Sequence, residues 1–560
     1  MKKNSAVSIL TMMLLAANPG QAQTPILVDS SATRRYVTTT PDFAGYPPGI
    51  ALDPASGYLA ISFLRLLPFT PSLRFLMAAI SLDNGRTWTL HENLDVGVAR
   101  DNQRDTRAPH VLATSKTPVI LWEERELNLP TVADVPVITK DLGGWNAGKW
   151  QNIIIDSTGT TTNLVQARYV RLAIAPDNSN LWGAAGFHRT QPIQALFYRS
   201  TDGGATWSEP IVVANAIPGN TDSTHVQALV ERTAFQITFS SGQKGLGAFA
   251  GRLTNADRLA RPFYSFTNNG GQTWLKPLPI PGTVNLDCGL MPGGLSTFVD
   301  GQGDWHVFAI GDNAQEAGTK LEIYDLKFAN GSWTITKVIS PLLHPLGLNF
   351  GFRSKSPLHP ALGKDGTIYL AYTDLVDTTG VILDPARETQ KTDVFIVKSR
   401  DGGKTWSRPV NVTQTPRLAE NFIGAAPVVT DKIHLTYTAE PSEDIEPWYL
   451  YYLAVPVENI TGVAEAAPPV RIPSQPVLWQ NRPNPVAPGT TIAFELQQSE
   501  TLTLIVFNML GQEVAILANG VLPAGRHHYS WNGAGLPAGI YFYRLQTARF
   551  SMTKKMILLR

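Results

Sequence analysis

The chain has a single cysteine, Cys288, among its 560 residues. It therefore forms no disulfide within the chain, and its stability must come from packing. It also lacks an excess of charge of either sign, with 46 basic against 45 acidic residues, which gives no reason to expect nucleic-acid binding or electrostatic membrane attachment. Long helical patterns are few, and 46 glycines and 41 prolines punctuate the chain, which predicts many short strands and turns.

The chain also lacks an apolar run long enough to span a membrane, so no transmembrane segment is predicted. Residues 1–22 have the pattern of a Sec signal peptide, in which Lys2 and Lys3 precede an apolar stretch at 6–17 and small residues at 20–22 suit cleavage. No cysteine stands directly after the predicted cleavage site, which excludes a bacterial lipid anchor there.

A phrase of the form Ser-x-Asp-x-Gly-x-Thr-Trp recurs along the chain. Its copies are complete at 81–88, 200–207 and 399–406, nearly complete at 267–274 with Asn269 in the Asp place, and eroded at 148–150 and 331–333. The final tryptophans are 57 to 73 residues apart, a period typical of propellers and solenoids. Asp, Asn and Gly suit a tight turn, so the Asp is predicted to staple a hairpin, and a metal-ligand role is the minor alternative.

This phrase resembles the Asp box, or BNR repeat, of sialidase-like β-propellers. We therefore expect an all-β fold with a six- or seven-bladed β-propeller over residues 30–455, followed by a small C-terminal β-sandwich. Six boxes give six blades, but three more strand-like segments follow the last box, and 35–39 precedes the first complete repeat. Those pieces form one blade from both ends of the propeller domain, which removes exposed edges, so we favour seven. Sialidases themselves have six.

A Pro-rich linker at 456–477 separates the propeller region from a C-terminal unit at 478–560. Alternating apolar positions and Gly/Pro turns predict a small antiparallel sandwich there. Its ordered motifs include 481–485, 504–514 and 535–545 and a basic, apolar end. They resemble the C-terminal sorting domain of the type IX secretion system. The resemblance implies type IX machinery as a partner and a secreted or outer-surface location, and the alternative is a fibronectin-like accessory module.

The sialidase resemblance also implies a site at one mouth of the central channel. Three arginines would grip a substrate carboxylate there, because a guanidinium pairs with it in bidentate fashion, and a Tyr–Glu pair and an acid/base Asp would act on the sugar. Arg107 begins a candidate inner strand, Glu124 lies on the next strand in a family-like position, and Asp134 lies on the loop beyond.

Weaker candidates come from the third and sixth repeats. Arg171 and Arg353 precede predicted inner strands, and Tyr372 stands where the family tyrosine is needed. Each has a structural alternative, since such an arginine is commonly a rim residue and such a tyrosine commonly belongs to the core.

No phosphate loop, nucleophile elbow or paired-cysteine zinc spacing occurs, so no cofactor and no metal are expected. Three functions stay open. The favoured one is a propeller that binds extracellular glycans or proteins. The alternatives are a sialidase-type exo-glycosidase acting on terminal sialic acid or a related acidic sugar, and a structural cell-surface protein. Fold analogy alone does not choose among them.

Overall fold

The computed structural model describes only part of the chain. The described residues are 25–32, 49–67, 70–95, 104–126, 134–156, 167–188, 193–215, 228–229, 235–252, 260–283, 286–288, 294–313, 321–339, 358–375, 382–384, 389–390, 392–414, 418–441, 448–461, 464–465, 476–496, 500–522, 525–548 and 550–559. Within these ranges the regular structure is β-strand apart from one short 3-10 helix, η2 (Val457–Asn459), so the all-β prediction is confirmed. The predicted signal peptide and the predicted strand at 35–39 lie outside them.

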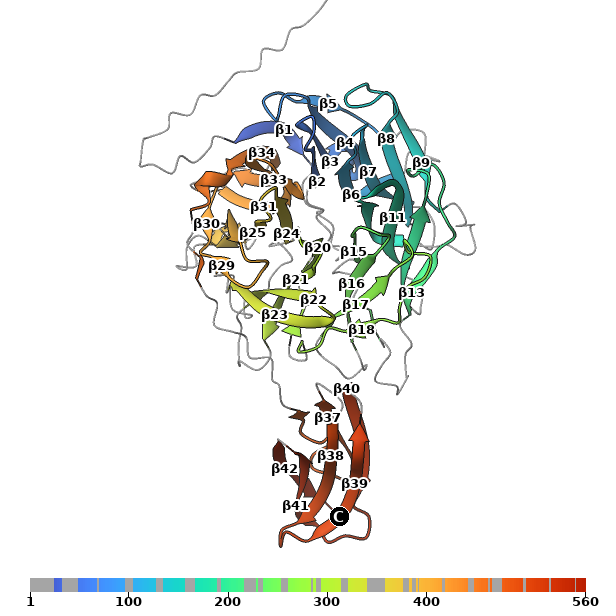
Figure 1. Cartoon of the computed structure of the whole chain (residues 1–560), viewed down its shortest axis with the longest axis vertical. Coiled ribbons are helices and arrows are strands. Elements are labelled where there is room, and N and C mark those ends of the chain that lie inside the picture. The colour runs from blue at the N-terminus through green and yellow to red at the C-terminus, as the bar shows by residue number, and fades with distance from the viewer. Residues whose placement is uncertain are drawn as a thin grey trace, which may run out of the picture.

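The strands that precede η2 form antiparallel groups that follow one another around a ring (Figure 1). The first three groups are β2 (Gly49–Asp53), β3 (Tyr58–Leu67), β4 (Thr70–Ser81) and β5 (Thr89–His91); β6 (Arg104–Ala113), β7 (Pro118–Glu126), β8 (Asp134–Asp141) and β9 (Trp150–Ile154); and β10 (Ala167–Ala175), β11 (Asn178–His188), β12 (Gln194–Ser200) and β13 (Ile211–Asn215). In each group the box or its remnant connects the third strand to the fourth.

The later groups repeat this plan. They are β14 (Ala228–Leu229), β15 (Gln236–Phe239), β16 (Gly245–Arg252), β17 (Arg261–Thr267) and β18 (Leu278–Pro279); β19 (Leu286–Asp287), β20 (Leu295–Val299), β21 (Trp305–Asn313), β22 (Leu321–Ala329) and β23 (Ser332–Ile339); β24 (His359–Gly363), β25 (Ile368–Leu375), β28 (Thr392–Ser399) and β30 (Val410–Asn411); and β31 (Leu418–Ala425), β33 (Lys432–Pro441) and β34 (Trp448–Pro456). Short pairings add β26 (Ile382–Asp384) with β27 (Thr389–Gln390), β29 (Trp406–Ser407) with β35 (Ala464–Glu465), and β32 (Val428–Val429) with β24.

The N-terminal strand β1 (Ile26–Ala32) joins the two ends of the ring. It pairs with β34 as the outer strand of the last group, so one blade combines the two ends of the propeller region, with residues 26–32 in the role expected of 35–39. Asp29 of β1 also receives a hydrogen bond from Arg65 of β3 at 2.9 Å. The count of seven blades stays a prediction, because β1 merges the first and last groups into one continuous sheet.

Apolar packing between neighbouring groups holds this ring together. In the described part of the chain, seven buried clusters each combine side chains of two consecutive groups, and one of them joins the last group to the first. Phe308 and Trp406, for example, meet across the fifth and sixth groups with ring centroids 5.7 Å apart. Since strand residues alternate between faces, each sheet presents one apolar face to either neighbour.

The boxes are turn staples, as predicted. In the first box, Asp83 accepts hydrogen bonds from the backbone N–H and the hydroxyl of Thr87, at 2.9 and 2.6 Å. Ser81 accepts from the N–H of Gly85 at 2.8 Å. The two bonds from Thr87, with a further one from the Ser81 hydroxyl to Asp83, lower the pKa of Asp83 to about 2. Gly85 has φ of 85°, and a Cβ there would lie 2.2 Å from the hydroxyl oxygen of Tyr452. The turn therefore needs glycine for both its conformation and its close packing.

The box tryptophans pack against the preceding group. The ring centroids of Trp88 and Tyr452 are 5.0 Å apart and those of Trp274 and Phe197 are 5.1 Å apart, both in an edge-to-face arrangement. In all six copies the indole N–H is buried without a hydrogen-bond partner among the described residues. The tryptophans thus act through ring packing between blades rather than through their polar atom.

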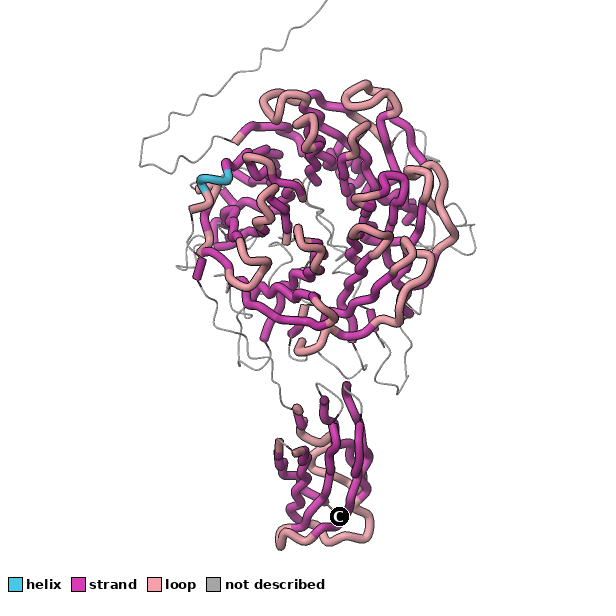
Figure 2. The backbone as a smooth tube through the Cα atoms, in the orientation of Figure 1, coloured by secondary structure: helices cyan, strands magenta, loops and turns pink. Residues whose placement is uncertain are grey.

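The C-terminal unit consists of two packed antiparallel sheets (Figure 2). One sheet contains β36 (Val477–Leu478), β37 (Gly489–Leu496) and β40 (Gly525–Asn532), and the other contains β39 (Glu513–Leu522), β38 (Glu500–Asn508), β41 (Gly539–Thr547) and β42 (Ser551–Leu558). A single buried cluster that includes Phe494, Val506 and Tyr543 fills the space between them. The predicted small β-sandwich is confirmed.

Candidate functional site

The inner strands surround the axis of the ring. Figure 1 shows β2, β6, β15, β20, β24 and β31 nearest that axis. Three inner strands carry a register slip near their starts, at residues 107–110 of β6, 168–171 of β10 and 421–424 of β31. A β-bulge re-aims side chains and is common beside functional sites. The starts of these strands therefore merit inspection as a site.

His110, Arg171 and His359 form what we call the axial cluster. They come from β6, β10 and β24, in the second, third and sixth groups, and each is partly buried. The positive charge of Arg171 lowers the pKa of both imidazoles, and Nδ1 of His110 accepts a hydrogen bond from the backbone N–H of Leu172, the residue after Arg171. Three distant parts of the sequence thus converge around one arginine.

Both histidines of the axial cluster are neutral at physiological pH. Burial is the main cause, and the nearby Arg171 adds to it, so that the pKa of His110 falls to about 3 and that of His359 to about 4. A cationic imidazole would have to form beside a guanidinium with little water to screen the repulsion. Among the described residues, the axial cluster therefore combines the positive charge of Arg171 with two neutral rings.

Hydrogen bonds assign a tautomer to each ring. Nδ1 of His110 accepts from the backbone N–H of Leu172 at 3.1 Å, so the ring proton of neutral His110 lies on Nε2. His359 bonds to the backbone of Ile423, while its Nε2 is buried without a partner among the described residues. A bond from Nδ1–H to that carbonyl leaves a lone pair on Nε2 of His359. The cluster thus offers one N–H donor and one open nitrogen acceptor.

Glu123 supports the strand that carries Arg171. It is buried on β7, and its Oε1 accepts from the N–H of Val170 at 2.9 Å. Arg171 in turn donates from Nη1 to the carbonyl of Val170 at 3.0 Å. Together with the His110–Leu172 bond, these contacts provide hydrogen-bond partners for the backbone groups of Val170 and Leu172 on the inner edge of β10.

Of the six predicted site residues, the structure places Arg171 in the axial cluster. Glu124 is half-buried on β7, and its backbone pairs with Thr106. Arg107 and Asp134 lie on β6 and β8, but their side chains are outside what the structure describes, and Arg353 lies outside the described residues altogether.

Tyr372 occupies a different environment from the one that a nucleophile needs. Its side chain is buried in the apolar cluster between the fifth and sixth groups, stacked 6.0 Å from Phe395. Burial and the nearby Asp374 raise its pKa well above the usual value, and its hydroxyl has no partner among the described residues. Tyr372 therefore packs as a core residue, which is the alternative to a catalytic role.

A second buried tyrosine is affected by two carboxylates. Tyr437 of β33 is buried between the sixth and seventh groups, where burial, Glu420 and Asp393 all raise its pKa. A raised pKa is the opposite of what activates a phenolate nucleophile. Sequence reasoning missed Tyr437, His110 and His359, because an isolated polar residue in an apolar strand gives no local signal of its partners.

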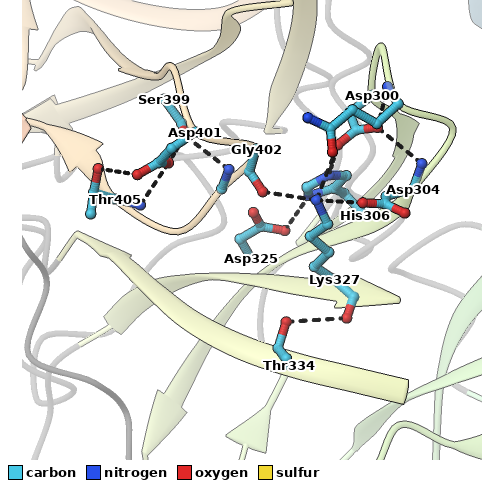
Figure 3. Close-up of polar contacts among 12 residues, drawn as sticks. Asp300, Asp304, His306, Asp325, Lys327, Thr334, Ser399, Asp401, Gly402 and Thr405 are labelled. Carbon is cyan, nitrogen blue, oxygen red and sulfur yellow. Dashed lines mark hydrogen bonds and ion pairs between the residues drawn. The ribbon is translucent and has the colours of Figure 1, made fainter. Parts of the chain in front are cut away.

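A dense polar cluster lies at the box end of the ring (Figure 3). His306 is fully buried between Asp325, with Nδ1 and Oδ1 2.8 Å apart, and Asp300, with Nε2 and Oδ2 3.3 Å apart. Lys327 donates to Asp300 and to the carbonyl of Gly402, both at 3.1 Å. Gly402 belongs to the box of the next group, so these contacts join two blades. Because successive strands alternate in direction, this end is opposite to the starts of the inner strands.

The last group of strands has different residues at the positions of His306 and Asp325. There His434 takes the place of His306 and Tyr452 that of Asp325, with His434 Nδ1 2.7 Å from the Tyr452 hydroxyl. Burial alone would lower the pKa of His306, but Asp325 and Asp300 outweigh it and raise that pKa to about 9. Burial lowers the pKa of His434 to about 4. The charged cluster around His306 thus connects the fifth group of strands to the sixth through the contact of Lys327 with Gly402.

The described residues contain no group of three or more His, Cys, Asp or Glu side chains arranged to hold a metal ion. They also contain no helix long and apolar enough to cross a membrane.

Family comparisons identify two segments of the chain. Residues 482–559 match the secretion system C-terminal sorting domain, and residues 198–209 match the BNR/Asp-box repeat. The chain therefore carries an Asp-box repeat and a type IX sorting domain, and the latter indicates export to the cell surface or beyond. No curated protein matches the sequence.

Several solved structures resemble the chain at low identity. The polysaccharide lyase Uly1 has a TM-score of 0.51 and 10% identity, over 78% of this chain and 99% of the lyase. An ulvan lyase bound to -[GlcA(1-4)Rha3S]- has a TM-score of 0.46 and 12% identity, over 77% of this chain and 96% of the lyase. Trypanosoma rangeli sialidase in complex with sialic acid has a TM-score of 0.40 and 10% identity, over 95% of this chain and 88% of the sialidase. At such identities the likeness concerns the fold alone.

Proposed function

We propose that this exported propeller binds an acidic glycan at its axis, with Arg171 as the anion-binding residue. The observation that carries the proposal is the hydrogen bond from Leu172 N–H to His110 Nδ1, which joins the inner strands of His110 and Arg171, together with the effect of the Arg171 charge on His110 and His359. A guanidinium pairs with a carboxylate or sulfate through two parallel N–H donors. Neutral imidazoles can bond to sugar hydroxyls without repelling a cation or competing for the anion.

The two tautomers suit a hydroxyl-rich ligand. Nε2–H of His110 can donate to a sugar oxygen, and the open Nε2 of His359 can accept from a sugar hydroxyl. A buried acceptor without a partner is costly, so a ligand hydroxyl there would stabilise the complex. The bonds to Leu172 and Ile423 fix both rings before the ligand arrives.

The same residues favour a second candidate, cleavage of a uronate polysaccharide by β-elimination. Arg171 would pair with the uronate carboxylate and stabilise the charge that develops when C5 loses its proton. Nε2 of His359 would accept that proton, and a pKa of about 4 makes it a free base at neutral pH. The C4–O glycosidic bond then breaks, a C4=C5 double bond forms, and the leaving oxygen takes a proton from Nε2–H of the His359 imidazolium, which returns that ring to its neutral form. Uly1, whose fold this chain resembles, is a polysaccharide lyase.

The sialidase alternative has less support from these residues. It needs a tyrosine activated by a glutamate, whereas Tyr372 and Tyr437 are both buried with raised pKa values. It stays an outcome of the test, as does a purely structural surface protein.

Binding of the purified full chain to polyuronates, a sulfated polysaccharide, sialosides and neutral dextran tests the proposal. Parent protein should bind an acidic glycan, and Arg171→Ala should weaken that binding at least about tenfold, as loss of a charge-assisted pair predicts. Arg86→Ala removes the same charge from an exposed box loop and should leave binding unchanged. A parent that binds no acidic glycan, or an Arg171→Ala variant that binds as well as parent, would sink the proposal.

The same samples separate binding from cleavage. A rise in the ultraviolet absorbance of an unsaturated uronate, lost in His359→Ala, establishes elimination. Release of sialic acid establishes the sialidase alternative instead. Binding without either product leaves the propeller as a glycan-binding protein.

A further inference from the structure

The sorting domain presents two large apolar side chains to solvent at one turn. Met509 and Leu510 follow β38 and are 67% and 82% exposed, and Leu510 is the most exposed large apolar residue in the part of the chain that the structure describes. Isolated exposed leucines are common on protein surfaces, but two adjacent ones at the tip of a hairpin form a protruding apolar knob.

Hydrogen bonds from Asn508 hold this turn rigidly. Its Oδ1 accepts from the N–H groups of Leu510 and Gln512, both at 3.0 Å, and its Nδ2 donates to Gln512 Oε1 at 2.8 Å. Its backbone N–H donates to the carbonyl of Gln512, and its carbonyl accepts from Gly511, again both at 3.0 Å. The apolar side chains are thus displayed in one backbone conformation, which lowers the entropic cost of inserting them into a partner.

The base of the turn is anchored in the sandwich. Val506 is fully buried in the core, and the guanidinium of Arg544 lies 4.9 Å from the ring centroid of Phe507. The knob therefore moves with the domain rather than as a loose loop. Since Met509 and Leu510 lie outside the buried cluster of the sandwich, both side chains are available for contact with a partner.

We propose that Met509 and Leu510 dock into an apolar pocket of the type IX secretion machinery. The knob lies inside the segment 482–559 that matches the sorting domain, and that domain indicates contact with this machinery. The turn residues 509–512 carry no charge, so a complementary surface must be apolar rather than ionic. This inference rests on the export role alone and is independent of the proposed glycan site.

Export from cells with a type IX secretion system tests it, with the full chain and a double variant, Met509→Ser with Leu510→Ser. The fraction of protein at the surface or in the medium should fall about tenfold or more, as expected when hot-spot anchors are removed. The matched control is Val521→Ser, since Val521 is 68% exposed on β39 of the same sheet but outside the turn. It should be exported like the parent.

Asn508→Ala provides a second variant that keeps both apolar side chains and removes the anchor of the turn. It should lower export by less than the double variant does. Thermal unfolding of the purified proteins checks that each variant is folded. The proposal is overturned if the folded double variant is exported like the parent, if Val521→Ser is equally impaired, or if the knob proves to mediate self-association while export is unchanged.

Discussion

Replacing His306 with glutamine should remove a pH dependence of stability that the parent protein shows at alkaline pH. His306 lies buried between Asp325 and Asp300, which raise its pKa from 6.5 to about 9. Because the folded-state pKa is above the unfolded value, the protonated imidazole stabilises the fold fully below pH 6.5, and this contribution disappears as pH rises through about 9. The shift corresponds to roughly 3 kcal/mol.

The last group of strands contains the matched control. His434 occupies the equivalent position, but its pKa is lowered to about 4, so it is neutral throughout the alkaline range. His434→Gln should therefore keep the alkaline loss of stability that the parent shows. Its own effect should appear in acid, where protonation of a buried imidazole destabilises the parent as pH falls from 6.5 toward 4.

The assay is urea unfolding of parent and variants, followed by tryptophan fluorescence, at several pH values from about 6 to about 10. The free-energy difference between parent and His306→Gln should be largest near pH 6 and should shrink by roughly 3 kcal/mol by pH 10. Parallel pH curves for parent and His306→Gln would refute the reasoning. So would an alkaline slope that also vanishes in His434→Gln.

Two further predictions concern packing. Gly85→Ala should lower the free energy of unfolding by about 2 kcal/mol or more, because alanine is strained at φ of 85° and its Cβ would collide with Tyr452, and a lowered melting temperature would show this. Trp406→Phe should lower the free energy of unfolding by about 1 kcal/mol less than Trp122→Phe does. The reason is that the indole N–H of Trp122 donates to Thr139 at 2.7 Å, whereas that of Trp406 has no acceptor among the described residues. Equal melting temperatures for the two tryptophan variants would contradict this account.

The repeat architecture was predictable because its signals are local. Each box places its turn residues, its staple and its tryptophan within eight positions, and hydrogen bonds such as that from Thr87 to Asp83 require only neighbouring residues. The same holds for the sorting domain, whose strands are short and consecutive. The N-terminal closing strand was placed at 35–39, but the strand seen in the ring is Ile26–Ala32, since strand pairing with β34 depends on a distant partner.

The candidate site was predictable only in part. The place of Arg171 before an inner strand makes it a candidate from the sequence, whereas His110 and His359 look like ordinary strand residues. Tyr372 was predicted as a stand-in for a nucleophile, whereas the register of β25 turns its ring into the core between blades. A shift of one residue in register moves a side chain to the other face, and the strand sequence alone does not set that choice.

The amino-acid sequence by itself determined the β-rich repeats, the turn chemistry of the boxes and the identity of the sorting tail, because these depend on contacts between near neighbours. Tertiary structure decided which side chains meet at the axis and what charge they carry there. His110, Arg171 and His359 lie on the inner strands of three different groups, which are brought around one axis only when the ring closes. Burial and the charge of Arg171 then lower the pKa of both histidines, so that the rings stay neutral well below pH 6.5.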